Sequence, residues 1–336
     1  MTITSLGDLA QSFVNRRQNA TIKQDINRLT SELASGRVGD LAAALSGDFG
    51  QLASVERAIA TAQAYQSASR EAGLFTQAQQ SALQAVSDGL STAASAMISA
   101  APSEIGSVLN AAADEADSQF RMAVSALNLP NAGRSLFAGT ASGQPALRPA
   151  QDILDALAAL TAGETSAAGI DAALDDWFLQ PGGGFETFAY QGATGDMPPF
   201  LLGEGQTAGP VPSAQDGGIR ATLKALAMGA LMRDGLVTSD TALRQEVLTA
   251  GGEAALAAKS RLTDTQAGIG TLQQRIEAQS VRLTSESAAL EIARAELVTA
   301  DPFETATRLE NAQFQLEALY AVTARTARLS LMDYLR

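Results

Sequence analysis

The chain has 336 residues, a net charge of −13 and only 5% aromatic residues, and it contains neither cysteine nor histidine. The acidic balance disfavours nucleic acids and anionic membranes as partners, because both need clustered Lys and Arg. Without Cys and His, thiolate metal sites and the Ser-His-Asp and Cys-His arrangements are excluded. These absences exclude most hydrolase mechanisms, and we expect a protein that is not an enzyme, with no catalytic, metal-binding or cofactor-binding residues.

The first predicted helix ends near Ser35, where Gly36 provides a natural stop. A short apolar segment precedes this helix. The apolar residues of the helix itself follow the four-then-three spacing of coiled-coil core positions. The short segment contains Leu6, Leu9 and Phe13, and the coiled-coil positions are Ile22, Ile26, Leu29 and Leu33. This spacing predicts that the helix packs along a second helix.

Two more helices are predicted before residue 130. Apolar residues keep a helical period from Gln51 to about Ala101, and Pro102 and Ser103 are expected to begin a helix that runs to about Leu129. Small Ala and Ser residues occupy many of the apolar positions. We therefore expect closely packed helices in this part of the chain.

The middle of the chain, residues 131–220, has a different composition. It contains seven of the ten prolines and 15 of the 29 glycines, and it has ten acidic but only three basic residues. Proline and glycine interrupt helices, so this segment is predicted to be a loop-rich, outward-facing insertion. Within it we expect a helix at 151–160, short strands around 187–191, and a small core that includes Trp177 and Phe178.

The last third of the chain is predicted to be helical again, at 218–232, at 239–300 and after Asp301-Pro302. The helix at 239–300 carries Leu or Ile at every seventh residue, and an apolar tail follows the last helix. These residues are Leu262, Ile269, Ile276, Leu283, Leu290 and Leu297 in the long helix, Leu309, Leu316 and Leu319 in the last one, and Leu329, Leu331, Tyr334 and Leu335 in the tail. Apolar stripes in both end segments predict a hairpin of the two termini.

Four short motifs resemble those of bacterial flagellins and hook–filament junction proteins. Glu32–Arg37 is similar to the L-x-S-G-x-R stretch that ends their first helix, and Leu136–Thr140 to an F-x-G-T turn. Asp301–Glu304 resembles the D-x-x-E segment before their terminal helix, and Leu329–Leu335 the LSLxDYL ending of the junction proteins. The matches cover both ends of the chain in the order that the family has.

The resemblance implies a mainly α fold, an elongated antiparallel helical bundle or coiled coil of both termini with a small loop-rich α/β insertion. It also implies that the termini become ordered on assembly, as in coupled folding and binding. The expected divisions are an assembly helix at 1–35, two halves of a helical rod at 36–130 and 219–300, the insertion at 131–218, and a second assembly helix at 301–336.

The resemblance further implies a structural protein of the extracellular flagellum, the adapter that joins the hook to the filament. The expected partners are further copies in a ring, the adjoining hook-associated protein, flagellin and an export chaperone. Export through the flagellar channel fits the first 17 residues, whose apolar residues are too interrupted for a cleaved secretory signal. In this interpretation the seams at 22–33 and 269–297 form the rod, while 6–13 and 316–335 make the innermost assembly contacts.

Two other functions fit the same patterns. A filament-forming flagellin differs from a junction protein mainly in the final motif and in the R-I-N-S-A-A-D-D-A-A-G run that flagellins have after Gly36, where this chain has Val38–Ala44 instead. A cytoplasmic coiled-coil scaffold would have the same heptads inside a stable dimer. Heptad spacing does not distinguish an intramolecular bundle from a polymer contact.

Overall fold

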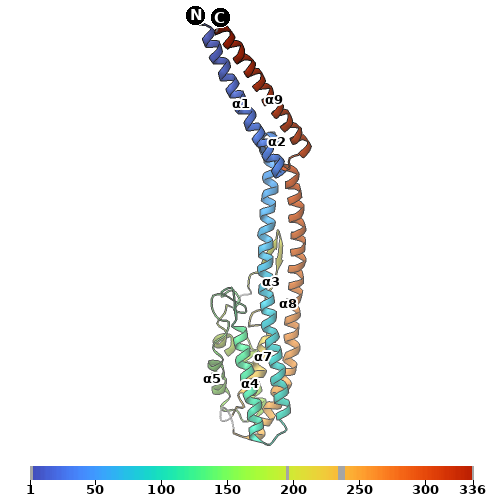
Figure 1. The fold of residues 1–336 in the computed structure, drawn as a ribbon. Helices are drawn as coiled ribbons and strands as arrows, with labels where there is room; N and C mark the ends of the chain where they lie inside the picture. The colour runs from blue at the N-terminus through green and yellow to red at the C-terminus, as the bar shows by residue number, and fades with distance from the viewer. Residues whose placement is uncertain (1–2, 194–196, 234–238, 335–336) are drawn as a thin grey trace. The chain divides into compact units, whose positions relative to one another are not determined.

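The computed structural model describes the backbone of residues 3–193, 197–233 and 239–334, and the side chains of 10–193, 197–233 and 239–325. The chain divides into two compact units (Figure 1). Unit 1 contains Met1–Ala62 and Ser285–Arg336, and unit 2 contains residues 63–284. The mainly α fold class is confirmed.

The described part of unit 1 is helical apart from its turns and one isolated β-bridge between Arg37 and Thr299. It contains α1 (Ile3–Ser35), the single turn α2 (Leu41–Ala44) and α9 (Pro302–Tyr334), together with the start of α3 (Gly50–Ala100) and the end of α8 (Thr241–Val298). Helices α1 and α9 pack side by side and run in opposite directions, so the predicted hairpin of the two termini is confirmed (Figure 1). The short apolar segment expected before the first helix is part of α1, which is continuous.

Unit 2 contains the remainder of α3 and α8 and the elements between them. Its helices are α4 (Gly106–Leu127), α5 (Ala150–Thr161), α6 (Ala167–Phe178) and α7 (Gly217–Ala230), and a π-helix, η1, covers Phe185–Ala189. The short strands β1 (Pro130–Asn131) and β2 (Arg134–Ser135) form one antiparallel pair, and β3 (Phe200–Gly203) and β4 (Gln206–Ala208) form another. The strands expected around 187–191 are wrong, because this segment is the π-helix and ends at a single bridge between Tyr190 and Leu147.

Helix α7 lies at the centre of unit 2, with all residues from Gly218 to Ala230 buried. Glycine permits this packing, because a Cβ at Gly229 would lie 2.5 Å from Met97 Sδ and 2.6 Å from the Cβ of Ala116. Similarly, a Cβ at Gly218 would lie 2.7 Å from the carbonyl oxygen of Arg261 on α8. Small residues therefore bring α3, α4 and α8 close to α7, in agreement with the closely packed helices expected from the sequence.

The middle segment of the chain shares this core. Its buried residues, among them Phe137, Leu147 and Ile153, belong to the same hydrophobic cluster as those of α3, α4, α7 and α8. Phe178 is fully buried and packs with its ring centroid 4.6 Å from that of Trp177, which agrees with their predicted place in a small core. The ring of Trp177 in turn lies where a Cβ of Gly184 would be.

Candidate assembly surface

The contact between α1 and α9 is narrow. On α1 the side chains of Ile22 and Ile26 are half-buried, Leu29 is 3% exposed, and Leu33 is 42% exposed. On α9 the residues that face inward are the buried Thr305 and Ala312 and the half-buried Leu309, Leu316 and Leu319. Such partial burial of Leu and Ile leaves each helix with much of its apolar surface still in contact with water.

Backbone hydrogen bonds join residues 36–38, which follow α1, to residues 298–300, which precede α9, at the base of this hairpin. Gly36 has a φ of +67°, a conformation that glycine adopts without strain, and it turns the chain out of α1. Val38 N then donates to Val298 O at 2.9 Å, and Ala300 N donates to Gly36 O at 3.0 Å. The end of α1 is thereby joined to the segment that leads into α9.

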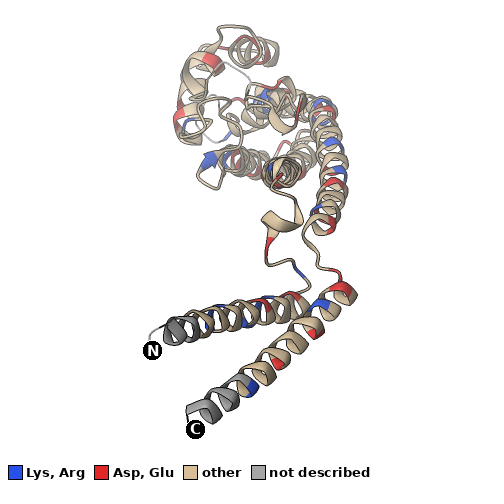
Figure 2. Cartoon of the chain, turned by 90° about the horizontal axis from the view of Figure 1, so that it is seen from above, with Lys and Arg blue, Asp and Glu red and all other residues tan. Residues whose placement is uncertain are grey.

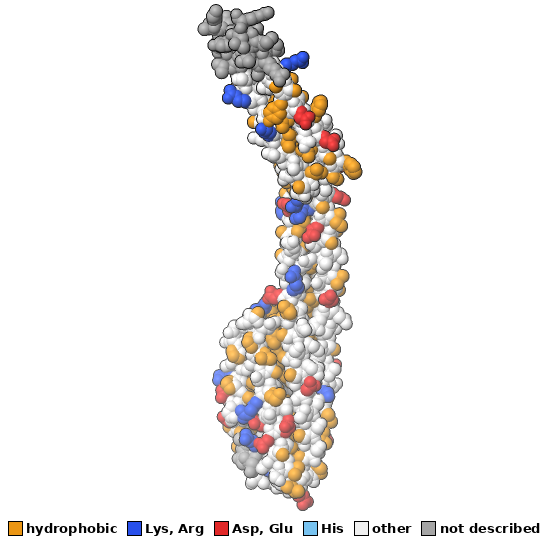
Figure 3. Space-filling model, viewed as in Figure 1, with side chains coloured by type: hydrophobic (Ala, Val, Ile, Leu, Met, Phe, Trp, Pro, Cys, Tyr) orange, Lys and Arg blue, Asp and Glu red, His pale blue; other side chains and the backbone are white. Residues whose placement is uncertain are grey.

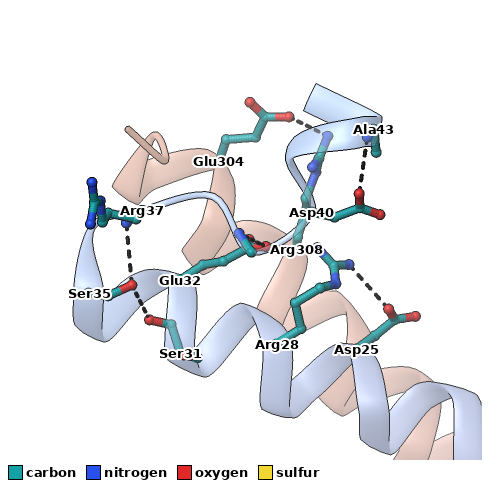
Figure 4. Close-up of polar contacts among 11 residues, drawn as sticks. Asp25, Arg28, Ser31, Glu32, Ser35, Arg37, Asp40, Ala43, Glu304 and Arg308 are labelled. Carbon is teal, nitrogen blue, oxygen red and sulfur yellow. Dashed lines mark hydrogen bonds and ion pairs between the residues drawn. The ribbon is translucent and has the colours of Figure 1, made fainter. Parts of the chain in front are cut away.

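A buried carboxylate closes the same turn (Figure 4). Glu32 Oε1 accepts hydrogen bonds at 2.9 Å from both Gly39 N and Arg28 Nη1, and Arg28 Nη2 also reaches Asp25 Oδ1 at 3.1 Å. The hydrogen bond with Asp25 and the charge of Glu32 raise the pKa of Arg28 above its usual value. Arg28 and Glu32 thus hold the turn after Gly36 against the last turns of α1.

One contact between the two helices changes a titratable group. The side chains of Asn19 and Lys23 on α1 lie near the hydroxyl of Tyr320 on α9, and their interaction with it lowers the pKa of Tyr320 below its ordinary value. A hydrogen bond to the ionised form and a nearby ammonium group both favour the phenolate. The contact adds polar specificity to a pairing that has little buried apolar surface.

Large apolar side chains remain exposed on both helices of the hairpin. On α9 Phe303 is 86% exposed, Phe314 is 70% exposed and Val322 is also exposed, while on α1 Phe13 is 65% exposed and Val14 lies beside it. Figure 2 and Figure 3 show uncharged stretches along both helices, with apolar side chains on the visible surface of the hairpin. Exposed aromatic residues at this density indicate a surface that contacts another chain.

The sequence prediction included Phe13 but missed Phe303 and Phe314. These two residues are 11 positions apart, which is three helical turns, so they lie on one face of α9. That face lies away from Leu309 and Leu316, which the heptad search found because they pack toward α1. A search for a second apolar stripe on the same helix would have detected it.

The heptad of α8 packs inside the chain. Leu262, Ile269, Ile276 and Leu283 are buried, whereas Leu290 and Leu297, which lie in unit 1, are half-buried. In unit 2 the carbonyl of Leu283 accepts a hydrogen bond from Gln66 Nε2 of α3 at 3.1 Å, so this part of the seam faces α3. The structure therefore places these residues against the protein's own helices.

The remaining predicted assembly residues lie near the two ends of the chain. Leu6 and Leu9 belong to α1, and Leu329, Leu331 and Tyr334 belong to α9, but their side chains lie outside the described part. Leu335 lies outside the described residues altogether. In the part of the chain that the structure describes, no helix is long and apolar enough to cross a bilayer, and no group of acidic residues is arranged to hold a metal ion.

The sequence of residues 253–335 matches the family model of the bacterial flagellin C-terminal helical region. No curated protein matches the sequence. Among solved structures, the chain is similar to a putative flagellar hook-associated protein from Vibrio parahaemolyticus, with 16% identity, a TM-score of 0.54, and 73% of this chain and 95% of the other covered. It is also similar to FlgL from Bacillus cereus, with 16% identity, a TM-score of 0.52, and 72% and 100% covered.

These matches agree with the resemblance seen in the motifs at both ends of the chain. The family model covers α9 and most of α8, and the structural similarity extends over most of the chain. Residues 253–335 are therefore similar to the flagellin C-terminal helical region, and the chain has the fold of flagellar hook-associated proteins.

Proposed function

We propose that this protein is a structural component of the bacterial flagellum, the adapter that joins the hook to the flagellin filament. The observation that carries the proposal is the α1–α9 hairpin, a two-helix unit with several large apolar residues exposed and few buried. Such a hairpin becomes more stable when copies associate, because association buries apolar surface that a single copy leaves in water. The proposal assigns no chemical reaction to the protein.

Two sets of residues on the hairpin have different roles in this proposal. One set is the pair of facing seams, Ile22–Leu33 of α1 and Leu309–Leu319 of α9, together with the end residues predicted from the sequence. The other is the outward face of α9 with Phe303 and Phe314, and the exposed Phe13 of α1. The facing seams would set the hairpin, and the outward residues would contact neighbouring copies.

The expected partners are copies of this chain in a ring, the adjoining hook-associated protein and flagellin. A chaperone would bind the protein before export, covering the apolar residues that the free hairpin leaves exposed. The similar structure from Vibrio parahaemolyticus is that of a putative flagellar hook-associated protein, which supports a place near the hook.

The test is electron microscopy of cells that lack the protein. We expect hooks without filaments and flagellin released into the medium, with both restored by the wild-type gene. A variant with Phe303 and Phe314 replaced by Ala should be produced and exported but fail to restore filaments. Normal filaments on cells that lack the protein would contradict the proposal.

A second candidate is a filament subunit, which the flagellin family match at 253–335 favours. The two functions differ in how far assembly continues, since an adapter stops after a limited ring whereas flagellin forms an open helical polymer. Purified protein added to filament seeds decides between them. Long filaments made of this chain alone would support the flagellin function.

A further inference from the structure

Helix α8 carries a line of arginines on its exposed face in unit 2. Arg261, Arg275 and Arg282 occupy the same heptad position, so they lie along one face, and Gly268 fills the fourth place in this line. All four residues are exposed, and none of the three guanidinium groups has an ion-pair or hydrogen-bond partner within the described parts of the chain. We call these four positions the arginine stripe.

A cavity of about 650 Å³ opens beside the stripe. It lies between α8 and the segment before α7, and its lining includes Gly268 and Arg275 on one side and Gln215 on the other. The carboxylate of Asp216 also lines the cavity, but its Oδ1 already accepts hydrogen bonds from the amides of Gly218 and Ile219 and from the hydroxyl of Thr265. Arg275 is therefore the group in the lining that can bind an incoming carboxylate.

Gly268 is not required by the packing of its own chain. A Cβ at this position would meet nothing within 4 Å, and its φ lies outside the left-handed region. Glycine weakens the interior of a helix relative to alanine, so its presence here is unexplained by the isolated protein. A neighbouring molecule that approaches the backbone of α8 closely would account for it.

The opposite charge is concentrated in another part of unit 2. Residues 149–219 contain ten acidic residues and no Lys or Arg. Lys224 neutralises Asp171 and Asp175, with 2.6 Å from its Nζ to an oxygen of each, and Arg220 neutralises Glu186. Three exposed acids on α5 and α6 keep their charge without an ion pair among the described residues: Asp152, Asp155 and Asp176.

Helix α5, which carries two of these acids, and helix α8, which carries the arginine stripe, lie on opposite sides of α4 and α7 in unit 2. Helix α5 packs against α4, α6 and α7, and Figure 1 shows α4 and α7 between α5 and α8. One copy therefore cannot join its own two surfaces, whereas two copies placed side by side can. A contact between two different surfaces of identical chains is the kind that builds a ring.

We propose that the arginine stripe of α8 binds the acidic α5–α6 surface of the next copy of this chain. The cavity beside Gly268 receives a carboxylate of the neighbour, which Arg275 binds, and the remaining arginines face the other acids. This inference rests on the proposed function, because it names the lateral contact of the ring. Complementary charge of this kind sets the orientation of neighbours and makes their association sensitive to salt.

The experiment uses the natural absence of cysteine. Full-length protein with Ala159→Cys on α5 is mixed with isotopically labelled protein with Thr271→Cys beside the cavity, at high concentration and low salt, and treated with a short bismaleimide. We expect mixed dimers to exceed the sum of the two like dimers, which random cross-linking would only equal, as read by mass spectrometry. They should fall sharply at 1 M salt, where the screening length is about 3 Å. A mixed product no greater than that from Ser95→Cys on α3, or mixed dimers that only equal the sum of the two like dimers, would overturn the proposal.

Charge reversal gives the matched control. Arg261→Glu with Arg275→Glu in one partner, or Asp152→Lys with Asp155→Lys in the other, should each lower the mixed product about tenfold, and mixing the two reversed proteins should restore it. Arg70→Glu, at an exposed arginine on α3 outside the stripe, should change nothing. Loss without restoration overturns the proposal, provided that circular dichroism shows folded variants.

The two hypotheses fail separately. If cells that lack the protein have bare hooks but the cross-links do not form, the lateral contact is wrong while the adapter function remains. If the cross-links form but filaments grow normally without the protein, the adapter function is wrong while the lateral contact remains.

Discussion

Arg28 and Gly39 share one oxygen atom, Oε1 of Glu32, at 2.9 Å each. Glu32 is only 5% exposed, and its carboxylate lies where the chain turns from α1 toward α2. It therefore ties a charged side chain of the helix to a backbone amide seven residues farther along.

Replacing Glu32 by Ala should loosen the turn. The Gly39 amide would lose its acceptor and Arg28 its nearer partner, a change that for a buried hydrogen bond amounts to about 1–3 kcal/mol. Hydrogen exchange at the Gly39 amide should accelerate accordingly. Asp25→Ala is the control, because this exposed partner of Arg28 should contribute less than about 1 kcal/mol. Equal exchange at Gly39 in Glu32→Ala and the wild type would show that the carboxylate does not hold the turn.

Replacing Phe314 by Ala should leave the isolated protein folded but block its incorporation into flagella. The ring is mostly exposed, so its loss should change the free energy of unfolding by less than about 0.5 kcal/mol. Circular dichroism during urea denaturation measures the stability, and immunoblotting of purified hook and filament fractions measures incorporation.

Leu29→Ala provides the contrast to Phe314→Ala, since this buried side chain packs within the hairpin. It should lower the protection of α1 against hydrogen exchange in the free protein. If Phe314→Ala protein enters flagella at the wild-type level, the outward face of α9 is not an assembly contact.

Two glycines should respond to alanine in opposite ways. Gly229→Ala would place a methyl group 2.6 Å from the Cβ of Ala116, and overpacking of this kind lowers the free energy of unfolding by about 1–3 kcal/mol. Gly268→Ala meets open space on an exposed helix face and should raise it by about 0.5–1 kcal/mol. Urea denaturation of both variants and the wild type provides the measurement. The prediction fails if Gly229→Ala is as stable as the wild type.

Tyr190 should make unit 2 less stable at high pH. Its hydroxyl donates to Ala193 O at 3.0 Å, and burial of the side chain raises the pKa of Tyr190 above its ordinary value. Above pH 10 the unfolded chain releases this proton while the folded chain retains it, so the free energy of unfolding falls as pH rises. The expected slope is at most about 1.4 kcal/mol per pH unit.

The comparison for Tyr190 is Tyr190→Phe, which should lose part of the decline between pH 9 and 11 in urea denaturation. The variant is expected to be less stable at neutral pH because it lacks the hydrogen bond to Ala193. An identical pH dependence in the two proteins would mean that Tyr190 does not contribute to the decline.

Sequence periodicity located the helices well because the two ends of the chain have little proline. The predicted boundaries at 151–160 and 239–300 agree with α5 and α8 within about two residues, and Gly36 does end α1. The strands at 187–191 were wrong because their aromatic residues favour strands locally, whereas here Phe185 and Tyr190 pack into a core with Trp177 and Arg220. Tertiary contacts therefore determine the conformation of this segment more than local strand propensity does.

The candidate surface was harder to predict than the helices. Heptad spacing finds residues that face another helix, but it does not indicate whether the second helix belongs to the same chain. Ile269 and Ile276 proved to be buried in unit 2, while the exposed Phe303 and Phe314 follow an 11-residue spacing that a heptad search passes over. The burial of each side chain distinguishes the residues that pack within the chain from those that remain exposed, and burial is known only once the chain is folded.

The lengths of α1 and α9 have a consequence for the two chain ends. Each helix has 33 residues, and both start from the joint that the Gly36 and Val38 hydrogen bonds make with residues 298–300. At 1.5 Å per residue, both extend about 50 Å from that joint, so Ile3 and Tyr334 finish level with each other. Removal of one helical turn from the free end of either helix would therefore leave the last turn of the other helix without a packing partner.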